Sequence, residues 1–574
     1  MKKFVKILIV AMMALVITAS LIACGDEDTH KGEFTHEINN ANDLKKISEM
    51  LGSDYDEGVF ELKSDVTISE DWSAIGSSVE NSFRGTFNGN NHTITYKINI
   101  PEPEERDVKG AIALEKYYGL FGVIHNAKIS NLTVNVDVTV PVDAESFFVG
   151  GLAGFMSGSN AIKNVTINGY VSTTMGNLCK YIDEENDWRE SERYAMSAYV
   201  GGLAGFVQGN STIDDVRSSV SIDVGAYNDG ACISGINDLF VGGIAGSMRT
   251  VNLSSLKENN EYCFAKNLTF TGSLKAIGSQ VNAGGIFGAA YRIKDGEKWY
   301  TNTTSITAQA YKRLRIGGIA GIIDRVDLNK AEVNLNALNV ETFSASTSRS
   351  FNAGGLVGYA ANFSNVSNAI SYVNKITVAT NTINYTGGLV GMLHYSSISN
   401  AVASGELYYG RYSVMNAATD VRYEGNTQNN PYYIYNGGAV GRLYGESKLN
   451  AIATTFKAYQ GLVGEVARAV EIIVVKEGDG ETYENWFNNT VYNANMINVS
   501  KDGDLVDGEQ KYRIIHNYDL SQTNLTFVKT NSRCYNDTLT NDKANEWYNE
   551  IGQEQDDDAT YNALYNTINS NINA

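Results

Sequence analysis

Two adjacent carboxylates, Asp214 and Asp215, are the first residues of this sequence to weigh for acid–base chemistry. Glycoside hydrolases use two carboxyl groups that flank the scissile bond at a separation of about 5 to 9.5 Å. Asp215 also occupies a position that recurs along the chain and otherwise holds asparagine, as described below. That recurrence favours a structural role for Asp215, so the sequence predicts no catalytic residue.

A second candidate is the basic run Lys312-Arg313-Leu314-Arg315, which leads directly into a predicted strand and places at least one basic side chain outward. A polysaccharide lyase would set such a side chain beside a calcium cluster. Asp502-Gly503-Asp504 and Asp507-Gly508-Glu509 resemble calcium loops but lack the Asp-x-Asp-x-Asp-Gly spacing. We therefore expect no metal site and no cofactor, and interpret the basic run as a solvated face.

Cysteines are too sparse to build a disulfide framework. Besides Cys24 the sequence has Cys179, Cys232, Cys263 and Cys534. Cys179 and Cys232 lie between repeats and could pair, and the sequence leaves this open. There is no Cys-x-x-Cys motif and no Cys/His cluster, which argues against a zinc site.

Tyrosines gather in one stretch of the second half of the chain. Aromatic rings with a hydroxyl group suit contacts with sugars and with protein partners alike. The alternative is that these side chains pack their loop onto the rest of the fold. The candidate binding residues are Tyr408, Tyr409, Tyr412, Tyr432 and Tyr433.

The element that must position any such residue is a repeated Gly-Gly-Leu/Ile-x-Gly motif. It lacks the Gly-Lys-Ser/Thr ending of a phosphate-binding loop. Most copies are 32 to 42 residues apart, and a period of this size predicts a stack of repeated structural units. We index each copy by the glycine directly before its Leu or Ile (before Ala439 in one copy). These indexed glycines are Gly119, Gly151, Gly202, Gly243, Gly285, Gly318, Gly355, Gly388, Gly438 and Gly461.

A second pattern, apolar-x-Asn-apolar, follows each indexed glycine by about 12 or 13 residues. The constant offset places the Asn at the same point of each coil, so that stacked coils would line these side chains up in a column. A carboxamide both donates and accepts, so the column could be hydrogen-bonded throughout. Its expected members are Asn131, Asn164, Asp215, Asn368, Asn400 and Asn450.

Short alternating strands follow the asparagines, and charged insertions separate the repeats, as expected of parallel coils with solvent-facing loops. The sequence thus predicts an all-β fold, a parallel β-solenoid over residues 111–465. Residues 34–110, with a helix over 34–52, would form its N-terminal cap, because a solenoid needs an atypical first unit. Residues 466–574 are expected to form a C-terminal cap and tail, with a strand near 470–475 and a helical or loose end.

The N-terminus predicts export. Met1-Lys2-Lys3 and an apolar run precede Leu21-Ile22-Ala23-Cys24-Gly25, which resembles a bacterial lipobox. Residues 1–23 would be a signal peptide, Cys24 the lipidated residue, and residues 24–33 an acidic tether. We therefore expect the chain on the extracellular face of a cell membrane or outer membrane, held by acyl chains.

Composition agrees with an extracellular β-rich protein. The formal net charge is −20 and charged residues make up 19% of the chain. A nucleic-acid-binding protein needs a basic face, so nucleic acid is excluded as a partner.

Taken together, the glycine repeats and the preceding segments 72–76 and 83–94 resemble the GLUG-repeat family of bacterial secreted or surface proteins. The resemblance covers about residues 35–465 and implies a right-handed parallel β-helix. Some members are IgA-specific metalloproteases with a His-Glu-x-x-His helix in a separate domain. Here His36-Glu37 is followed by no second histidine at that spacing, which argues against a zinc protease.

We expect a surface module that binds a glycan or a host or matrix protein, as an adhesin does, and not an enzyme. The alternatives are a β-helix polysaccharide hydrolase or lyase, which needs converging carboxylates or a basic residue beside calcium, and a passive surface component that self-assembles. The sequence does not identify the ligand, the oligomeric state or the number of membranes of the cell.

Overall fold

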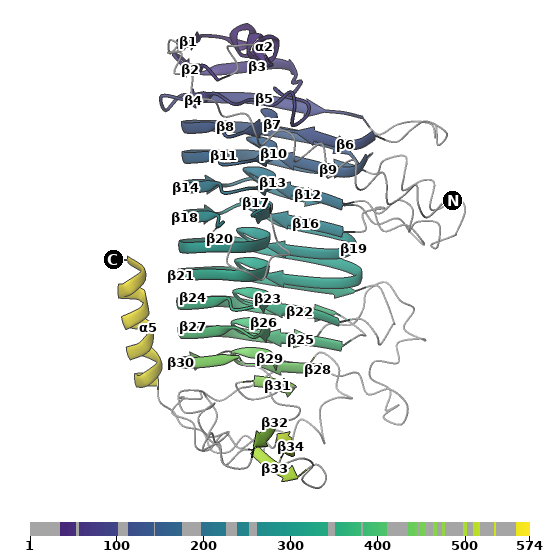
Figure 1. Cartoon of the computed structure of the whole chain (residues 1–574), viewed down its shortest axis with the longest axis vertical. Coiled ribbons are helices and arrows are strands. Elements are labelled where there is room, and N and C mark those ends of the chain that lie inside the picture. Colours follow the sequence, from purple (N-terminus) through teal and green to yellow (C-terminus); the bar gives the residue numbers. More distant parts are fainter. Residues whose placement is uncertain are drawn as a thin grey trace, which may run out of the picture. The chain divides into compact units, whose positions relative to one another are not determined.

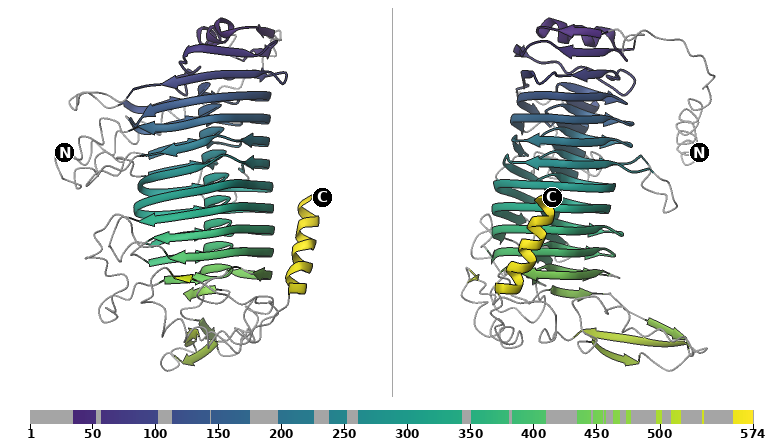
Figure 2. Two further views of the ribbon diagram at one scale, coloured as in Figure 1. Left: turned by 180° about the vertical axis from the view of Figure 1, so that it is seen from behind. Right: turned by 90° about the vertical axis from the view of Figure 1, so that its left-hand side faces the viewer.

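A computed structural model describes the fold (Figures 1 and 2). The chain divides into two compact units, Met1–Thr35 and His36–Ala574, and the fold described here is that of the second. The structure describes residues 35–52, 57–101, 113–142, 144–174, 197–225, 238–251, 261–342, 350–379, 383–409, 434–444, 447–454, 456, 463–467, 473–476, 497–501, 509–516, 533–534 and 558–573. Cys24, the signal peptide, the tether and the two calcium-like loops lie outside these residues, except for Glu509, which begins a strand.

The unit is all-β and consists mainly of one large parallel sheet wound in successive coils (Figure 1). One complete coil comprises β12 (Ser197–Gly201), β13 (Ala204–Gln208), β14 (Thr212–Ser218) and β15 (Ser221–Val224). Each pairs in parallel with the equivalent strand of the next coil, for instance Val200 with Val241 and Val216 with Leu268. The indexed glycines therefore recur at one register position.

The remaining strands fall into the same series. Strands that end at the glycine pair are β6 (Ala113–Tyr118), β9 (Ala144–Gly150), β16 (Asp238–Gly242), β22 (Ser350–Gly354), β25 (Ile383–Gly387) and β28 (Ile434–Gly437). Those that follow it are β7 (Phe121–His125), β10 (Ala153–Ser157), β17 (Ala245–Arg249), β23 (Val357–Ala361), β26 (Val390–His394), β29 (Val440–Tyr444) and β31 (Val463–Ala467). Strands later in the coil are β8 (Lys128–Pro141), β11 (Ala161–Thr174), β18 (Phe264–Phe270), β24 (Asn365–Ala379), β27 (Ser397–Tyr409) and β30 (Lys448–Thr454). Three long strands run through coil corners: β19 (Leu274–Gly284), β20 (Phe287–Gly317) and β21 (Ala320–Thr342).

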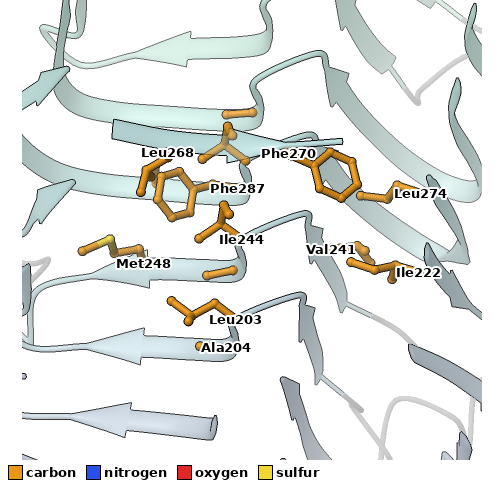
Figure 3. Packing of buried hydrophobic residues seen from close by; sticks show 14 of the residues in the cluster. Leu203, Ala204, Ile222, Val241, Ile244, Met248, Leu268, Phe270, Leu274 and Phe287 are labelled. Carbon is orange, nitrogen blue, oxygen red and sulfur yellow. The ribbon is translucent and has the colours of Figure 1, made fainter. Parts of the chain in front are cut away.

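Alternation along each strand builds the core inside the coils. The leucine or isoleucine of each glycine motif points inward and stacks on its counterpart, as Leu203 and Ile244 do (Figure 3). Leu203 and Ile244 are fully buried, and so are Phe270 and Phe287 from neighbouring coils. Burying each such side chain contributes about 1.5–3 kcal/mol, which explains why these inward positions stay apolar in every coil.

The motif glycines are required by close backbone approach. A β-carbon at Gly151 would lie 2.5 Å from the carbonyl oxygen of Gly202 in the next coil. One at Gly154 would lie 2.8 Å from the backbone nitrogen of Tyr118. Neither glycine has a positive φ. Gly151 is thus packed between coils, and Gly154 both approaches the preceding coil and lies inside the bend, where a β-carbon would be 3.0 Å from the Phe148 carbonyl oxygen.

The N-terminal end differs from the expected helix over 34–52. Residues Thr35–Ile38 form strand β1, and helix α2 covers only Ala41–Met50. Asn40 starts this helix because its side chain accepts hydrogen bonds from the backbone N–H groups of Asn42 and Asp43. Leu44 and Ile47 of α2 are buried in the core.

Much of the expected N-terminal cap belongs to the coil ladder itself. Strand β2 (Val59–Leu62) pairs with β4 (Thr86–Asn88), and β4 pairs with β8. Likewise β3 (Val66–Asp71) pairs with β5 (Thr93–Asn99), and β5 pairs with β8. Strand β1 pairs with β2 as well, so at this end of the described residues only α2 lies outside the ladder.

Residues beyond the glycine repeats form two small features. Strands β32 (Ile473–Lys476), β33 (Ile497–Lys501) and β34 (Glu509–His516) make an antiparallel sheet, and β35 (Arg533–Cys534) pairs with β27. Helix α5 (Asp558–Asn573) lies along the outside of β24 and β27 (Figure 2). Its fully buried Ile568 packs against Ile370 and Val402.

Candidate functional site

The asparagine column is a backbone feature first. Its members occupy equivalent register positions and have left-handed φ values between 50° and 64°. Asn and Asp adopt this conformation more readily than other residues with a side chain. The described members are Asn131, Asn164, Asp215, Asn267, Lys298, Lys330, Asn368 and Asn400.

The predicted membership is wrong at Asn450. This residue pairs with Ser399, so Ala451 stands opposite Asn400. The offset of 12 or 13 residues left one residue of ambiguity, and the alignment of the apolar neighbours resolves it, since Ile452 pairs with Ala401. Lys298 and Lys330 were missed because the predicted pattern required asparagine at this position, and two coils have lysine there.

Hydrogen bonding along the column is local. Asn164 Nδ2 donates to Asn131 Oδ1 at 2.9 Å, and Asn131 Nδ2 donates to Asn88 Oδ1 at 3.2 Å. Farther along, Asn368 instead donates to Asn329 Oδ1, one position before the column. All members of the column therefore share the left-handed backbone conformation. The hydrogen bond from one column asparagine to the next is present only in the first of the described coils.

The two carboxylates considered for hydrolysis are engaged in different contacts. Asp214 Oδ1 accepts a hydrogen bond of 2.8 Å from Asn267 Nδ2 in the next coil. Asp215 Oδ1 pairs with the guanidinium of Arg217 at 2.7 Å. Both contacts tie the carboxylates to the coil surface, in agreement with a structural role.

The predicted tyrosine site lies mostly outside the described residues. Tyr408 and Tyr409 end strand β27, where their backbones pair with Arg533 and Cys534. Tyr412, Tyr432 and Tyr433 are outside the described ranges, as are Gly461, Cys179 and Cys232. Cys263 is a buried free thiol whose Sγ lies 3.0 Å from the Gly209 carbonyl oxygen, and burial raises its pKa to about 12.

A polar trough, which the sequence did not predict, crosses five successive coils. Its volume is about 690 Å³. Every lining residue is uncharged, and most carry a hydroxyl or a carboxamide. The lining of this amide trough is Ser219, Ser221, Thr271, Gly272, Ser273, Asn302, Thr303, Thr304, Asn334, Leu335, Asn336, Tyr372 and Asn374.

Register explains how the trough forms. Asn302 pairs with Asn334, and Asn334 pairs with Tyr372, so one outward position contributes to it in successive coils. Asn374 Nδ2 donates to Asn336 Oδ1 at 3.1 Å, which fixes the amides of one wall. Tyr372 is 46% exposed and offers a ring at one end. Asn302 and Tyr372 each stand 17 residues after the indexed glycine of their coil, Gly285 and Gly355. This constant spacing is the sequence signal that could have identified them as neighbours.

A second outward surface lies in the angle between the strand that ends at the glycine pair and the strand that follows it. We call it the GG corner. Its sharpness follows from Gly205, where a β-carbon would lie 2.7 Å from the Tyr199 carbonyl oxygen. Tyr199 and Phe206 face each other across the bend, with ring centroids 4.8 Å apart and planes at 15°.

The GG corner is aromatic in its first coils. Tyr117, Phe148, Tyr199 and Phe240 stack in one column, with successive centroids 4.9–5.3 Å apart. This spacing is close to the strand separation of about 4.8 Å, so in-register coils bring the rings into contact. In later coils the same column holds Asn282, Arg315 and Asn352.

The basic run lies at this change. Leu314 is fully buried in the core, so its neighbours Arg313 and Arg315 point outward, as the sequence predicted of at least one. Arg315 reaches the GG corner, where its guanidinium carbon lies 4.8 Å from the centre of the Tyr359 ring.

Metal ligands and membrane-spanning helices are the remaining features to place. Within the ranges given above, no three His, Cys, Asp or Glu side chains are grouped as metal ligands would be. None of the helices in the described part of the chain is both long and apolar enough to cross a membrane.

Comparison with known proteins identifies no family for this chain. No protein-family model matches the chain. No curated protein matches it. One similar solved structure is described as a "putative immunoglobulin A1 protease from Bacteroides ovatus", with 14% identity over 66% of this chain and 78% of that chain, at a TM-score of 0.26. A TM-score this low transfers neither fold nor activity.

Proposed function

We propose that the protein is a glycan-binding module of the cell surface, and that the amide trough is its binding site. The observation that carries the proposal is the lining of this trough, in which hydroxyl and carboxamide groups surround a concavity of about 690 Å³ beside the exposed ring of Tyr372.

The chemistry of the trough suits a neutral saccharide. Sugar hydroxyls both donate and accept hydrogen bonds, and so do carboxamides and hydroxyl side chains. The ring of Tyr372 supplies an apolar plane with a polar tip, on which the C–H face of a pyranose can stack. A protein or nucleic-acid partner with many charges would find no ion-pair partner in this lining.

The coil arrangement extends the proposal to the fold and location. Parallel pairing between successive coils supports a parallel β-helix with α2 at its N-terminal end, and the resemblance to the GLUG-repeat family implies that it is right-handed. Cys24 in its lipobox sequence supports a lipid anchor on the extracellular face of the membrane. An anchored module of this kind would act as an adhesin.

A glycan array with the purified chain tests the binding function. Neutral glycans that bind are then titrated against Tyr372→Ala and against the control Tyr170→Ala. Tyr170 is also exposed, at 39%, but does not line the trough. We expect Tyr372→Ala to weaken binding about tenfold, equivalent to about 1.4 kcal/mol of lost stacking, and Tyr170→Ala to have no effect. Absence of binding, or equal losses in both variants, would contradict the proposal.

A further inference from the structure

The later coils of the GG corner carry three arginines. Arg249, Arg315 and Arg442 belong to strands β17, β20 and β29. Arg249 and Arg315 are two coils apart, and Arg315 and Arg442 are three coils apart. At the strand separation of about 4.8 Å, these steps correspond to about 10 and 14 Å along the stack.

Aromatic rings hold each of these guanidinium groups. Arg249 lies over Phe206 and Arg315 over Tyr359, each with its guanidinium carbon 4.8 Å from the ring centre. Arg442 lies 4.8 Å from the centre of the Tyr385 ring and donates from Nη1 to the Tyr385 hydroxyl at 2.7 Å. Stacking fixes the orientation of a planar fork that could otherwise adopt many rotamers.

Two of the arginines have donors left over. In the described residues, no carboxylate lies within ion-pair distance of Arg249 or Arg315, and the buried Nε of each makes no hydrogen bond. A buried donor without a partner costs about 1–3 kcal/mol, so such groups call for a partner outside these residues.

Amide groups flank the central arginine. Arg315 pairs in register with Asn282 on one side and Asn352 on the other. Both asparagines are nearly fully buried, and the Oδ1 of each lacks a hydrogen-bond donor among the described residues. The corner thus combines two arginines and two asparagines that each have a buried unpartnered atom, in four consecutive coils.

The nearest carboxylates do not cancel this charge. Asp324, in the coil of Arg315, accepts from Arg325 and from Asn362 at 2.7 Å each. Asp238, two coils earlier, lies near Lys312 and Arg313 instead, and burial raises its pKa. The GG corner is therefore locally cationic in a chain with a net charge of −20.

We propose that the GG corner between Arg249 and Arg442 binds an acidic polysaccharide through the carboxylates of its uronic acid residues. A guanidinium fork matches a carboxylate bidentately. Hydroxyl groups of the same sugar can accept hydrogen bonds from guanidinium N–H groups that the carboxylate leaves free, since each guanidinium carries five donors. The step of about 10 Å between Arg249 and Arg315 is the length of a disaccharide in an extended chain.

One further polar contact of the corner involves two titratable groups. Tyr359 is hydrogen-bonded to His394, with its hydroxyl oxygen 2.7 Å from Nδ1. Burial raises the pKa of Tyr359 and lowers that of His394. Both shifts favour the neutral forms, so the contact joins an uncharged phenol to an uncharged imidazole and adds no charge to the corner.

Calorimetric titration with oligogalacturonate tests the inference. The matched variants are Arg315→Ala and Arg217→Ala, which remove the same charge, the second from a side chain that is 57% exposed and paired with Asp215 outside the corner. We expect Arg315→Ala to weaken binding at least tenfold and Arg217→Ala to change it by less than twofold. Arg315→Lys should lose several-fold because a lysine lacks the fork. Arg249→Ala gives an independent second test if Arg315→Ala does not fold.

Titrations with two other ligands test which chemical class of ligand the GG corner binds. Methyl-esterified oligogalacturonate should not bind, and poly-glutamate of equal charge should bind at least tenfold more weakly, since it lacks sugar rings and hydroxyls. Equal binding of the ester, equal binding of poly-glutamate or equal losses in Arg315→Ala and Arg217→Ala would each overturn the proposal. Tyr372→Ala should leave oligogalacturonate binding unchanged, so failure at the trough and failure at the corner are distinguishable.

Discussion

Gly205 provides the sharpest test of how the glycine motif shapes the fold. A β-carbon at this position would lie 2.7 Å from three backbone atoms: the Gly154 and Tyr199 carbonyl oxygens and the Val149 nitrogen. Carbon atoms of side chains do not approach backbone atoms this closely, so the chain must move by several tenths of an ångström. All three atoms belong to strands that are paired with neighbours on both sides, which leaves no flexible group to yield.

We therefore expect Gly205→Ala to destabilise the coils around it by about 2–3 kcal/mol, in the upper range for an overpacked site. Gly278→Ala is the matched control, because a β-carbon there would meet only side-chain atoms of Leu239 and Val281 at 3.3 Å. That contact is tight but can relax, and the expected change is below about 1 kcal/mol.

The test needs a measurement of local opening in individual coils as well as a measurement of the stability of the whole stack. Coils contact only their neighbours, so unfolding need not be a single cooperative step. Hydrogen exchange should show faster opening of β12 and β13 in Gly205→Ala, and urea denaturation should show a lower midpoint than for Gly278→Ala. If the two variants had equal stability and equal exchange, close backbone approach would not be what requires glycine in the motif.

Three further predictions can be tested, two based on the structure and one on the sequence around Cys24. Asn164→Ala should be about 1 kcal/mol less stable than Asn164→Gly in urea denaturation, since φ is 51° and alanine avoids that region; equal stabilities would contradict a backbone role for the column. Burial, and to a lesser degree Arg442, lower the pKa of His394 in the folded state. The unfolded chain then binds the proton more readily, so stability should decrease as pH falls through about 6.5, and His394→Asn should lessen this decrease in denaturation midpoints measured from pH 7.5 to 5.5. Cys24→Ala should abolish incorporation of labelled fatty acid and release the protein from the membrane fraction; unchanged labelling would refute the lipid anchor.

The backbone repeat was predictable because its cause is local and identical in every coil. Each coil needs an inward apolar residue, leucine or isoleucine in most coils and Ala439 in one, and a glycine where backbones approach, so the indexed glycines mark the register directly. The helix at the N-terminus was predicted too long because an apolar pattern does not separate β1 from α2 across Asn40, which begins the helix. The misplacement of Asn450 has a similar origin, since spacing alone fixed its position to within one residue.

The outward surfaces were not predictable in the same way. Arg249, Arg315 and Arg442 stand six residues after, three before and four after their respective indexed glycines, Gly243, Gly318 and Gly438. No single spacing links them, and insertions of different lengths separate them in the chain. Only the fold shows that these three offsets all face the GG corner, on two strands joined at a sharp bend.

A coil stack separates the groups that determine stability from those that determine recognition. Ladder hydrogen bonds belong to the backbone, and the core belongs to inward side chains such as Leu203 and Ile244. Outward columns are constrained by neither, so one column can pass from stacked rings at Tyr199 and Phe240 to the cation of Arg315 without any change of register. The same freedom gives the amide trough its uncharged lining on another side of the same coils. Ligand specificity in this chain should therefore follow the outward residues at fixed offsets from each glycine, and the glycine motif itself should be indifferent to the ligand.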